Sequence, residues 1–460
     1  MPGMTMRRRI VRARELVAPV KGFFWGMARA PGMIARTKED GCNPRPAGQE
    51  RPSAELAPVW RWLPAGVALL AWVALAIKAT DRELSERAKD WFDWMTWPPF
   101  SDLQVMWAGI AAHAQGTDPL LANELSYNYP RLWLVTSGGG LHGVPLVPAA
   151  LGLVAAFLIF AIWMLRVRSR REATLVSLLL VSPAVTLALE RANTDLAIFV
   201  LVGGSIAYAP KANQFGRGLV TVAALLLAGM LKLYPAIALA GGVVFSLGRR
   251  RVLFGAAVLA FALYAASHLT ELGLIAQKTQ RDYHASYGTN VLGTGFRNHF
   301  FEDTWPAESL RRFDRLAPAM SLGFYLALLI VAARRGWRAH ADFAPVGCDD
   351  RTRAWFWAGA LIYCGSFALG NCFVYRLIFL LPCLPFIRAA ANTPSARRWA
   401  IATFAALFVT MMKPLSPAFG WFLLFHPPQW VLALLLAGGV TALGRCAISS
   451  DSGGERQSGY

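Results

Sequence analysis

The sequence predicts an all-α, polytopic transmembrane protein, and three observations lead to this fold class. Hydrophobic residues make up 55% of the 460-residue chain and charged residues only 16%, well below the roughly 25% of soluble domains. Apolar runs close to membrane-spanning length recur along the chain from residue 62 onward. The basic residues stand in short clusters between these runs, where the positive-inside rule places the cytoplasmic ends of membrane helices.

These clusters account for the positive charge of the chain without a nucleic-acid partner. The formal net charge is +19, and its main clusters are RVRSRRE (166–172), GRRR (248–251) and ARRGWR (333–338). Because each cluster follows an apolar run, the expected partner is the lipid bilayer and not nucleic acid. The six cysteines form no CxxC pair and the seven histidines no HxxxH pair. No metal or other cofactor is therefore expected.

The composition divides the chain into three regions. Residues 1–61 are basic and rich in proline, glycine and arginine, and we expect a disordered cytoplasmic tail. Residues 62–445 form the transmembrane domain, and 446–460 form a flexible C-terminal tail. The domain contains about 12 membrane segments, expected at 62–78, 144–165, 173–189, 195–210, 219–234, 235–248, 252–271, 317–333, 354–370, 376–390, 399–414 and 418–444.

The charges also predict an orientation with both termini in the cytoplasm. With the basic tail inside, every strongly basic cluster falls on the cytoplasmic side, and the longest polar loops, 79–143 and 272–316, fall outside. An even number of crossings then requires that 219–248 crosses twice or dips and returns. Because long loops on one face usually carry function, we expect the functional site on the non-cytoplasmic side.

The first outer loop contains a predicted amphipathic interfacial helix. In SDLQVMWAGIAAHAQGTDPL (101–120), Ser101 and Gln104 have the spacing of a capping box, and apolar residues then recur at helical spacing. Asp102 falls in the first turn, where it either supports the helix N-terminus or serves chemistry. The following SYNYPRLWL (126–134) supplies Tyr127, Tyr129 and Arg131, as an aromatic belt or as part of a sugar site.

Charges at the outer ends of two apolar segments are further candidates, because charges at membrane depth are costly. LALERANTDLAIF (187–199) contains Glu190, Asn193 and Asp195, and Glu190 pairing with Arg191 is the alternative without function. GMLKLYPAIAL (229–239) contains Lys232, followed by Tyr234. Lys232 either extends to the interface or binds a phosphate.

Two later segments carry the remaining candidate residues. RDYHASYGTNVLGTGFRNHF (281–300) contributes His284, Arg297 and His299. GNCFVYRLIFLLP (370–382) contributes Tyr375 and Arg376 at the start of an apolar span. An arginine in this position is a candidate phosphate ligand.

Taken in order, these segments give the chain a resemblance to the GT-C membrane glycosyltransferases. It looks closest to glycosyltransferase family 87, the polyprenyl-phosphate-mannose-dependent α-mannosyltransferases of bacteria. The resemblance covers about residues 62–390 and is carried by SDLQVMWAGIAAHAQGTDPL, SYNYPRLWL, LERANTDLAIF with LKLYP, and YRLIFLLP. The chain departs from the family at Tyr129-Pro130-Arg131, where the family often has tyrosine–proline–proline.

This resemblance implies a GT-C fold and an inverting transfer of mannose, or a related hexose or pentose, from a polyprenyl-phosphate donor. The acceptor is a glycan or glycolipid on the outer face, and the location is a bacterial plasma membrane with the active site toward the periplasm or exterior. Asp102 matches the general base. Donor-phosphate contacts are expected from Lys232, Arg376, Arg297 and Arg131, and sugar or acceptor contacts from Tyr127, Tyr129, Glu190, Asn193, Asp195, Tyr234, His284, His299 and Tyr375.

The alternative function is a membrane transporter or lipid flippase. That class predicts charges at mid-bilayer and internal repeat symmetry. In this sequence the charges instead gather at the outer ends of the apolar segments, and no internal repeat is visible.

Overall fold

The computed structural model describes residues 57–81, 99–122, 124–139, 143–208, 215–245, 248–279, 285–413 and 419–454. The chain divides into Met1–Glu55 and Leu56–Tyr460, and all described residues belong to the second unit. The predicted N-terminal tail therefore lies outside the described residues, except for its last five positions.

The described chain is mainly helical, and each of the twelve predicted apolar segments falls largely on helix where it is described. In chain order the helices are α2 (Pro58–Thr80), α4 (Ser101–Ala114), η1 (Arg131–Gly139), α5 (Leu146–Leu165), α6 (Arg170–Leu180), α7 (Pro183–Glu190), α8 (Asp195–Tyr208), α9 (Phe215–Leu231), α10 (Ala236–Phe245), α11 (Gly248–Ser267), α12 (Leu269–Lys278), α13 (Thr289–Phe296), η4 (Arg297–Phe301), α14 (Ala307–Arg338), α15 (His340–Phe343), α16 (Asp350–Ala368), η5 (Val374–Cys383), α17 (Leu384–Ala391), α18 (Arg397–Met411) and α19 (Phe419–Gly454). Strands β1 (Ser286–Tyr287) and β2 (Cys372–Phe373) form one short antiparallel pair.

The number of helices suited to cross a membrane is smaller than the number of apolar segments. Among the described residues, five spans are long and apolar enough: α2, α5, α14, the continuous η5–α17 segment and the apolar part of α19. The total rises to seven if two bent pairs, α6–α7 with a 48° bend and α11–α12 with a 72° bend, each count as one span. The chain is thus an all-α protein with helices suited to a membrane, and twelve crossings stay a prediction.

Two helices extend beyond the boundaries predicted for the apolar segments. Helix α2 begins at Pro58 rather than at residue 62, with the proline in the first turn, where it needs no hydrogen-bond partner for a backbone N–H. Helix α19 continues to Gly454, into the segment 446–460 that was predicted as a tail. The predicted break near 232–235 is confirmed, because α9 ends at Leu231 and α10 begins at Ala236.

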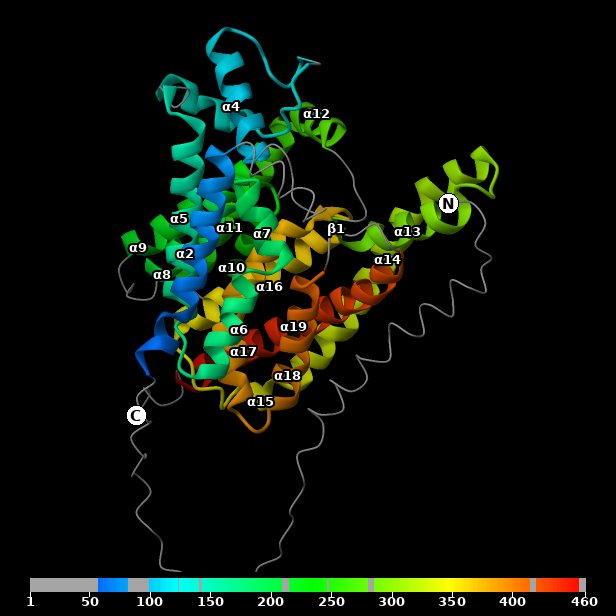
Figure 1. Ribbon diagram of the computed structural model, residues 1–460. Helices are drawn as coiled ribbons and strands as arrows, with labels where there is room; N and C mark the ends of the chain where they lie inside the picture. Colours follow the sequence, from blue (N-terminus) through cyan, green and yellow to red (C-terminus); the bar gives the residue numbers. More distant parts are fainter. Residues whose placement is uncertain are drawn as a thin grey trace, which may run out of the picture. The chain divides into compact units, whose positions relative to one another are not determined.

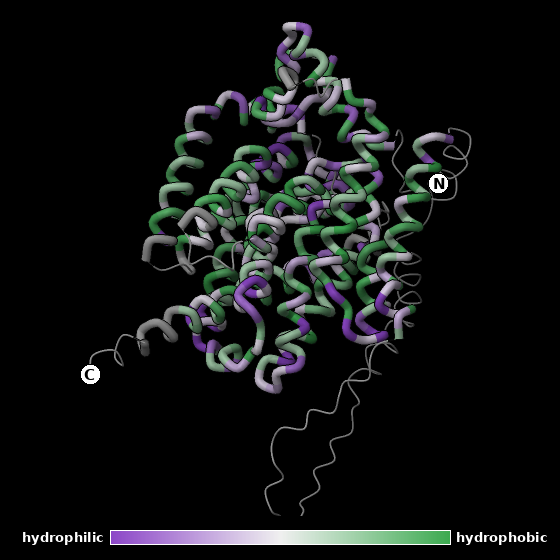
Figure 2. The backbone as a smooth tube through the Cα atoms, turned by 90° about the vertical axis from the view of Figure 1, so that its left-hand side faces the viewer, coloured by the Kyte–Doolittle hydropathy of each residue, from purple (hydrophilic) through white to green (hydrophobic). Residues whose placement is uncertain are grey.

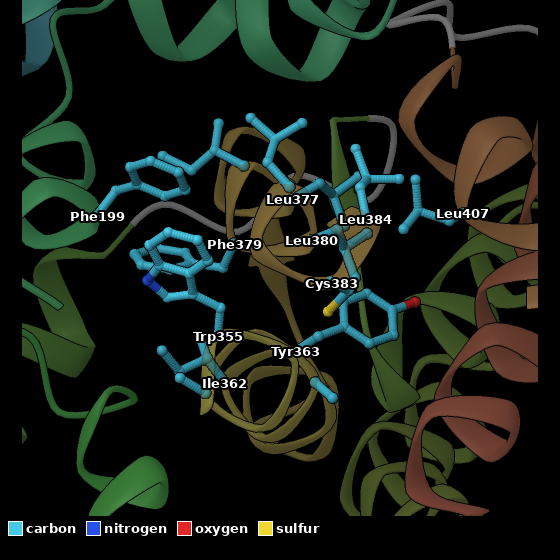
Figure 3. Packing of buried hydrophobic residues seen from close by; sticks show 14 of the residues in the cluster. Phe199, Trp355, Ile362, Tyr363, Leu377, Phe379, Leu380, Cys383, Leu384 and Leu407 are labelled. Atoms are coloured by element: carbon cyan, nitrogen blue, oxygen red, sulfur yellow. The ribbon is translucent and has the colours of Figure 1, made fainter. Parts of the chain in front are cut away.

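The core is built around α16 and η5 (Figure 3). Buried side chains of α16 pack beside those of η5, and Phe199 of α8 reaches Phe379 with ring centroids 5.9 Å apart. The close approach depends on Gly359, since a Cβ there would lie 2.5 Å from the carbonyl oxygen of Phe379. Because η5 begins with Val374, Tyr375 and Arg376, this packing also fixes the residues that reach the site.

The small strand pair fixes the start of η5, because β2 directly precedes η5 and pairs with β1. Tyr287 is opposite Cys372 and Ser286 opposite Phe373. Glycines with left-handed backbone flank the pair, Gly288 with φ 125° and Gly370 with φ 98°, a region that favours glycine because it has no Cβ.

The described helices place polar loops at the ends of apolar helices. In Figure 1, α4 and α12 lie at one end of the described unit and α15 at the other. Figure 2 shows hydrophobic residues along the helices and hydrophilic residues mainly toward their ends. The candidate site lies near the end that carries α4 and α12.

Candidate functional site

A cavity of about 590 Å³ is lined by residues from six separate parts of the chain, and six of the fourteen predicted site residues are among them. Its charged lining residues are Asp102 of α4, Arg191 after α7, Lys232 after α9, Lys278 of α12 and Arg376 of η5. Its aromatic lining residues are Tyr129, Tyr234, Phe373 and Tyr375. The chain therefore brings together in space five of the six segments that sequence analysis selected separately, and the described part of 281–300 contributes no lining residue.

Asp102 reaches the cavity from the first turn of α4, as predicted, but the predicted capping box is wrong. The residue before the helix is Phe100, which has a left-handed backbone with φ 62°. The Gln104 side-chain amide donates to the carbonyl oxygen of Pro99 at 3.1 Å instead of reaching the backbone of Ser101. The backbone N–H of Phe100 donates to the carbonyl oxygen of Glu190 at 2.7 Å, which joins the start of α4 to the end of α7.

Both carboxylate oxygens of Asp102 receive hydrogen bonds from the turn between α7 and α8. Arg191 Nη2 donates to Oδ1 at 2.5 Å, and Asn193 Nδ2 donates to Oδ2. The Oδ1 atom of Asn193 accepts from the backbone N–H of Asp195 at 2.8 Å. Asn193 thus links the carboxylate of Asp102 to the backbone of Asp195, and both the NH₂ group and the oxygen of its amide form hydrogen bonds.

Arg191 is a charged lining residue of the cavity that sequence analysis did not select as a candidate. It was considered only as a local partner of Glu190, and that pairing is wrong, since Arg191 turns to Asp102. Glu190 instead pairs with Lys78, at the end of α2, with side-chain exposures of 0% and 8%. The sequence did contain a signal for Arg191. An arginine can form two parallel hydrogen bonds to one carboxylate or phosphate, and this one stands between Glu190 and Asp195.

The turn that presents these residues has a strained backbone. Ala192, fully buried between Arg191 and Asn193, has φ 42°. A non-glycine residue in this region costs on the order of 1–3 kcal/mol, and such residues cluster at functional sites. The same is true of Phe100 on the opposite side of Asp102.

A second carboxylate lies behind the cavity and holds two cations. Asp195 has no exposed surface, and its Oδ1 is 3.2 Å from Lys232 Nζ while its Oδ2 is 3.5 Å from Arg376 Nε. A buried charge needs such compensation.

Aromatic rings cover the same two cations. The ammonium of Lys232 is 4.5 Å from the ring centroid of Tyr129, and the guanidinium carbon of Arg376 is 5.0 Å from that of Tyr234. These contacts favour the charged forms of both side chains. The rings of Tyr129 and Tyr234 therefore form part of the cavity wall beside its positive groups.

The described charges around the cavity leave a positive excess. Four lining side chains are cationic, Arg191, Lys232, Lys278 and Arg376, and one is anionic. Counting Asp195 as well, four positive charges face two negative ones, which leaves a net charge of +2 from these residues. Such a site favours an anionic ligand, and the attraction is stronger in a partly dehydrated cavity than in water.

A network of polar contacts fixes the loop that follows α4. Arg131 is not a lining residue; it pairs with Asp118 at 2.5 Å and with Glu271 of α12 at 3.4 Å. Lys278 Nζ donates to three loop carbonyl oxygens, at 2.7–3.1 Å. Burial alone would raise the pKa of Asp118, but hydrogen bonds from Arg131 and the Leu120 backbone outweigh burial and hold that pKa below its usual value.

Tyr127 contacts this loop without lining the cavity. Its hydroxyl donates to the carbonyl oxygen of Pro130 at 3.1 Å. Its ring lies against Gly109 of α4, where a Cβ would be 2.2 Å from a ring carbon. The predicted sugar contact of Tyr127 is therefore placed behind the wall, whereas Tyr129 is in it.

Two further predicted residues, Arg297 and His299, do not line this cavity. Arg297 lies 2.9 Å from Asp314 and 3.7 Å from Glu302. The ring of His299 meets Phe300 edge-on, with centroids 4.8 Å apart. His284 lies outside the described residues.

Comparison with known proteins gives no match: no protein-family model, no curated protein and no solved structure matches the chain.

Proposed function

We propose that the chain is a membrane glycosyltransferase that moves a sugar from a polyprenyl-phosphate donor to a glycan or glycolipid acceptor. The observation that supports this most strongly is that one cavity is lined both by a carboxylate and by cations. The carboxylate is that of Asp102, and the cations include Arg191, Lys232 and Arg376. The reaction needs one base and a site for a lipid-linked phosphate. The sugar that best fits the resemblance is mannose or a related hexose or pentose.

In this proposal each group has one task. Asp102 accepts the proton of the acceptor hydroxyl as that oxygen attacks the anomeric carbon, a contribution typically worth about 10²–10⁴ in rate. The bond from the anomeric carbon to the phosphate breaks, and the cations stabilise the charge left on the polyprenyl phosphate. The tyrosines of the wall offer faces and hydroxyl groups to the sugar ring. A single displacement of this kind inverts the anomeric centre.

The membrane arrangement belongs to the same proposal. A lipid-linked donor must reach the cavity from the bilayer, which the apolar helices around the site would allow. We propose a GT-C arrangement with the cavity on the non-cytoplasmic side of a bacterial plasma membrane, and with both termini in the cytoplasm.

The test is sugar transfer by purified protein carrying Asp102→Asn. Asparagine keeps the size of the side chain but cannot take up the proton, so transfer from a polyprenyl-phosphate-linked sugar should fall about 10²–10⁴-fold. The matched control is Asp314→Asn, an acidic residue of α14 that pairs with Arg297 away from the cavity. The base assignment is wrong if Asp102→Asn transfers sugar as fast as this control.

A further inference from the structure

We propose that Arg191 alternates between two anions during turnover, the carboxylate of Asp102 and the phosphate of the donor, and that this exchange releases Asp102 to act as base. The inference rests on the proposed function, because it assigns a donor contact and an order of events to the same cavity. It begins with the two hydrogen bonds that hold Asp102. One comes from Asn193, which is buried and neutral, and the other from Arg191, which is charged and lines the cavity.

Arg191 is the cavity cation best placed to move. Its side chain is 25% exposed, against 10% for Lys232 and 18% for Arg376. The latter two pair with Asp195, which has no exposed surface, whereas the partner of Arg191 is Asp102, which lines the cavity and has a second hydrogen bond from Asn193. Arg191 instead contacts Asp102 through Nη2, while its Nε is buried without a hydrogen-bond partner among the described residues. A guanidinium has donors to spare for a phosphate.

The backbone around Arg191 lets the side chain move while its base stays fixed. The preceding Glu190 is anchored by Lys78 of α2 and by the backbone N–H of Phe100. The following Ala192 is fully buried. If Arg191 leaves, Asn193 still holds Oδ2 of Asp102, because its own amide is fixed by the N–H of Asp195. The carboxylate then keeps its orientation and presents a free Oδ1.

The exchange matches the charges of the reaction. The acceptor oxygen bonds to the anomeric carbon, its proton passes to Asp102, and the carbon–oxygen bond to the phosphate breaks with its electron pair on the phosphate. The phosphate thereby changes from a singly charged diester to a monoester that carries a second negative charge. Arg191 is attracted more strongly to the phosphate as that charge develops, and the neutral protonated Asp102 no longer competes for it.

A consequence is that donor binding comes before activation of the acceptor. While Arg191 occupies Oδ1, the oxygen that would take the acceptor proton already has a charge-assisted hydrogen bond. Donor phosphate draws Arg191 away and frees that oxygen. A site built in this way limits hydrolysis and side reactions in the absence of donor.

The test is a double-mutant cycle on the binding of sugar-free polyprenyl monophosphate to the purified full-length chain. In the wild-type background, Asp102→Asn removes the competing carboxylate, and the dissociation constant should fall about tenfold, or 1.4 kcal/mol. In the Arg191→Gln background the same change should alter it less than about threefold, because no arginine is left to be released. Arg353→Gln, an exposed arginine paired with Asp350, is the matched control background and should keep the tenfold effect.

Two controls distinguish a lost contact from a folding defect. They are the Arg191→Lys variant and thermal unfolding of each variant. Lysine keeps the charge but not the fork, so this variant should retain a reduced effect of Asp102→Asn, between those of the arginine and glutamine backgrounds. An equal gain from Asp102→Asn with and without Arg191, or no gain in either, overturns the exchange. Failure of every variant and of the wild-type chain to bind the lipid phosphate would instead overturn the proposed function itself. Normal binding with an unchanged transfer rate in Asp102→Asn would overturn the base assignment.

Discussion

At the scale of single residues, the site depends on charges that compensate one another across long sequence separations. Asp102 is held by residues 89 and 91 positions later, and Glu190 by a lysine 112 positions earlier. Each contact removes a charge from water, so its partner is needed for folding as well as for chemistry. The Lys78–Glu190 pair is the clearest example, because neither side chain lines the cavity.

We predict that breaking the Lys78–Glu190 pair on one side destabilises the protein more than removing both charges. Glu190→Gln removes the carboxylate that pairs with the buried ammonium of Lys78, and Lys78→Met removes the ammonium that pairs with the buried carboxylate of Glu190. Each variant should therefore lower the free energy of unfolding by about 3–5 kcal/mol. The double variant should lose less than either single variant. Thermal unfolding in detergent measures the coupling.

The control is the exposed pair formed by Glu308 and Arg312 on α14, with side chains 68% and 75% exposed. The same cycle there should give a coupling below about 0.5 kcal/mol. Equal coupling in the two cycles would contradict a structural role for the buried pair.

Site residues could be predicted where the sequence shows an isolated charge beside an apolar run. They could not be predicted where their role depends on an ion-pair partner far away in the sequence. Asp102, Lys232 and Arg376 stand out as charges beside apolar runs, and all three line the cavity. Arg191 and Lys78 look like ordinary charges at helix ends. Their roles follow from partners about 90–110 positions away, and local patterns carry no information on such contacts.

At the scale of elements, broken helices position the site. Lys232 lies in the break between α9 and α10, and Arg191 in the break between α7 and α8. Arg376 lies in η5, a 3₁₀ helix that follows a strand. The sequence predicted helix at each apolar segment, but periodicity cannot distinguish a 3₁₀ from an α-helix in a fully buried run. The small strand pair also leaves no pattern of its own.

We predict that Gly359→Ala disturbs the site through η5 alone. The added Cβ would meet the Phe379 carbonyl at 2.5 Å, so η5 must shift, and overpacking of this kind costs typically about 1–3 kcal/mol. Because η5 carries Tyr375 and Arg376, affinity for polyprenyl phosphate should fall together with the unfolding temperature.

Gly152→Ala on α5 is the matched control, since a Cβ there meets nothing within 4 Å. Alanine is the better helix former by up to about 1 kcal/mol, so this variant should be as stable as the wild type or more so, with unchanged lipid-phosphate binding. Similar losses in both variants would show that the α16–η5 contact does not position Arg376.

At the scale of the whole molecule, hydropathy and charge predicted a helical membrane protein, and the described helices agree. The crossings were harder to count because several apolar helices are too short to span a bilayer alone, such as α8 with 14 residues. Two further segments bend by 48° and 72°. Short and bent helices leave polar groups at membrane depth, and such groups are tolerated where they line a cavity. The helix breaks that make the membrane crossings hard to count therefore also position the residues of the cavity.

The most direct measurement is the fate of the anomeric centre when purified wild-type chain in lipid nanodiscs receives β-linked polyprenyl-phosphate mannose and lipid-linked glycan acceptors. A single displacement with Asp102 as base predicts a new α-linked sugar on the acceptor, read by NMR, with stoichiometric release of polyprenyl phosphate. A β-linked product would contradict the single displacement. Movement of the intact donor across the bilayer of sealed vesicles, with no sugar transferred, would contradict the glycosyltransferase and support the transporter.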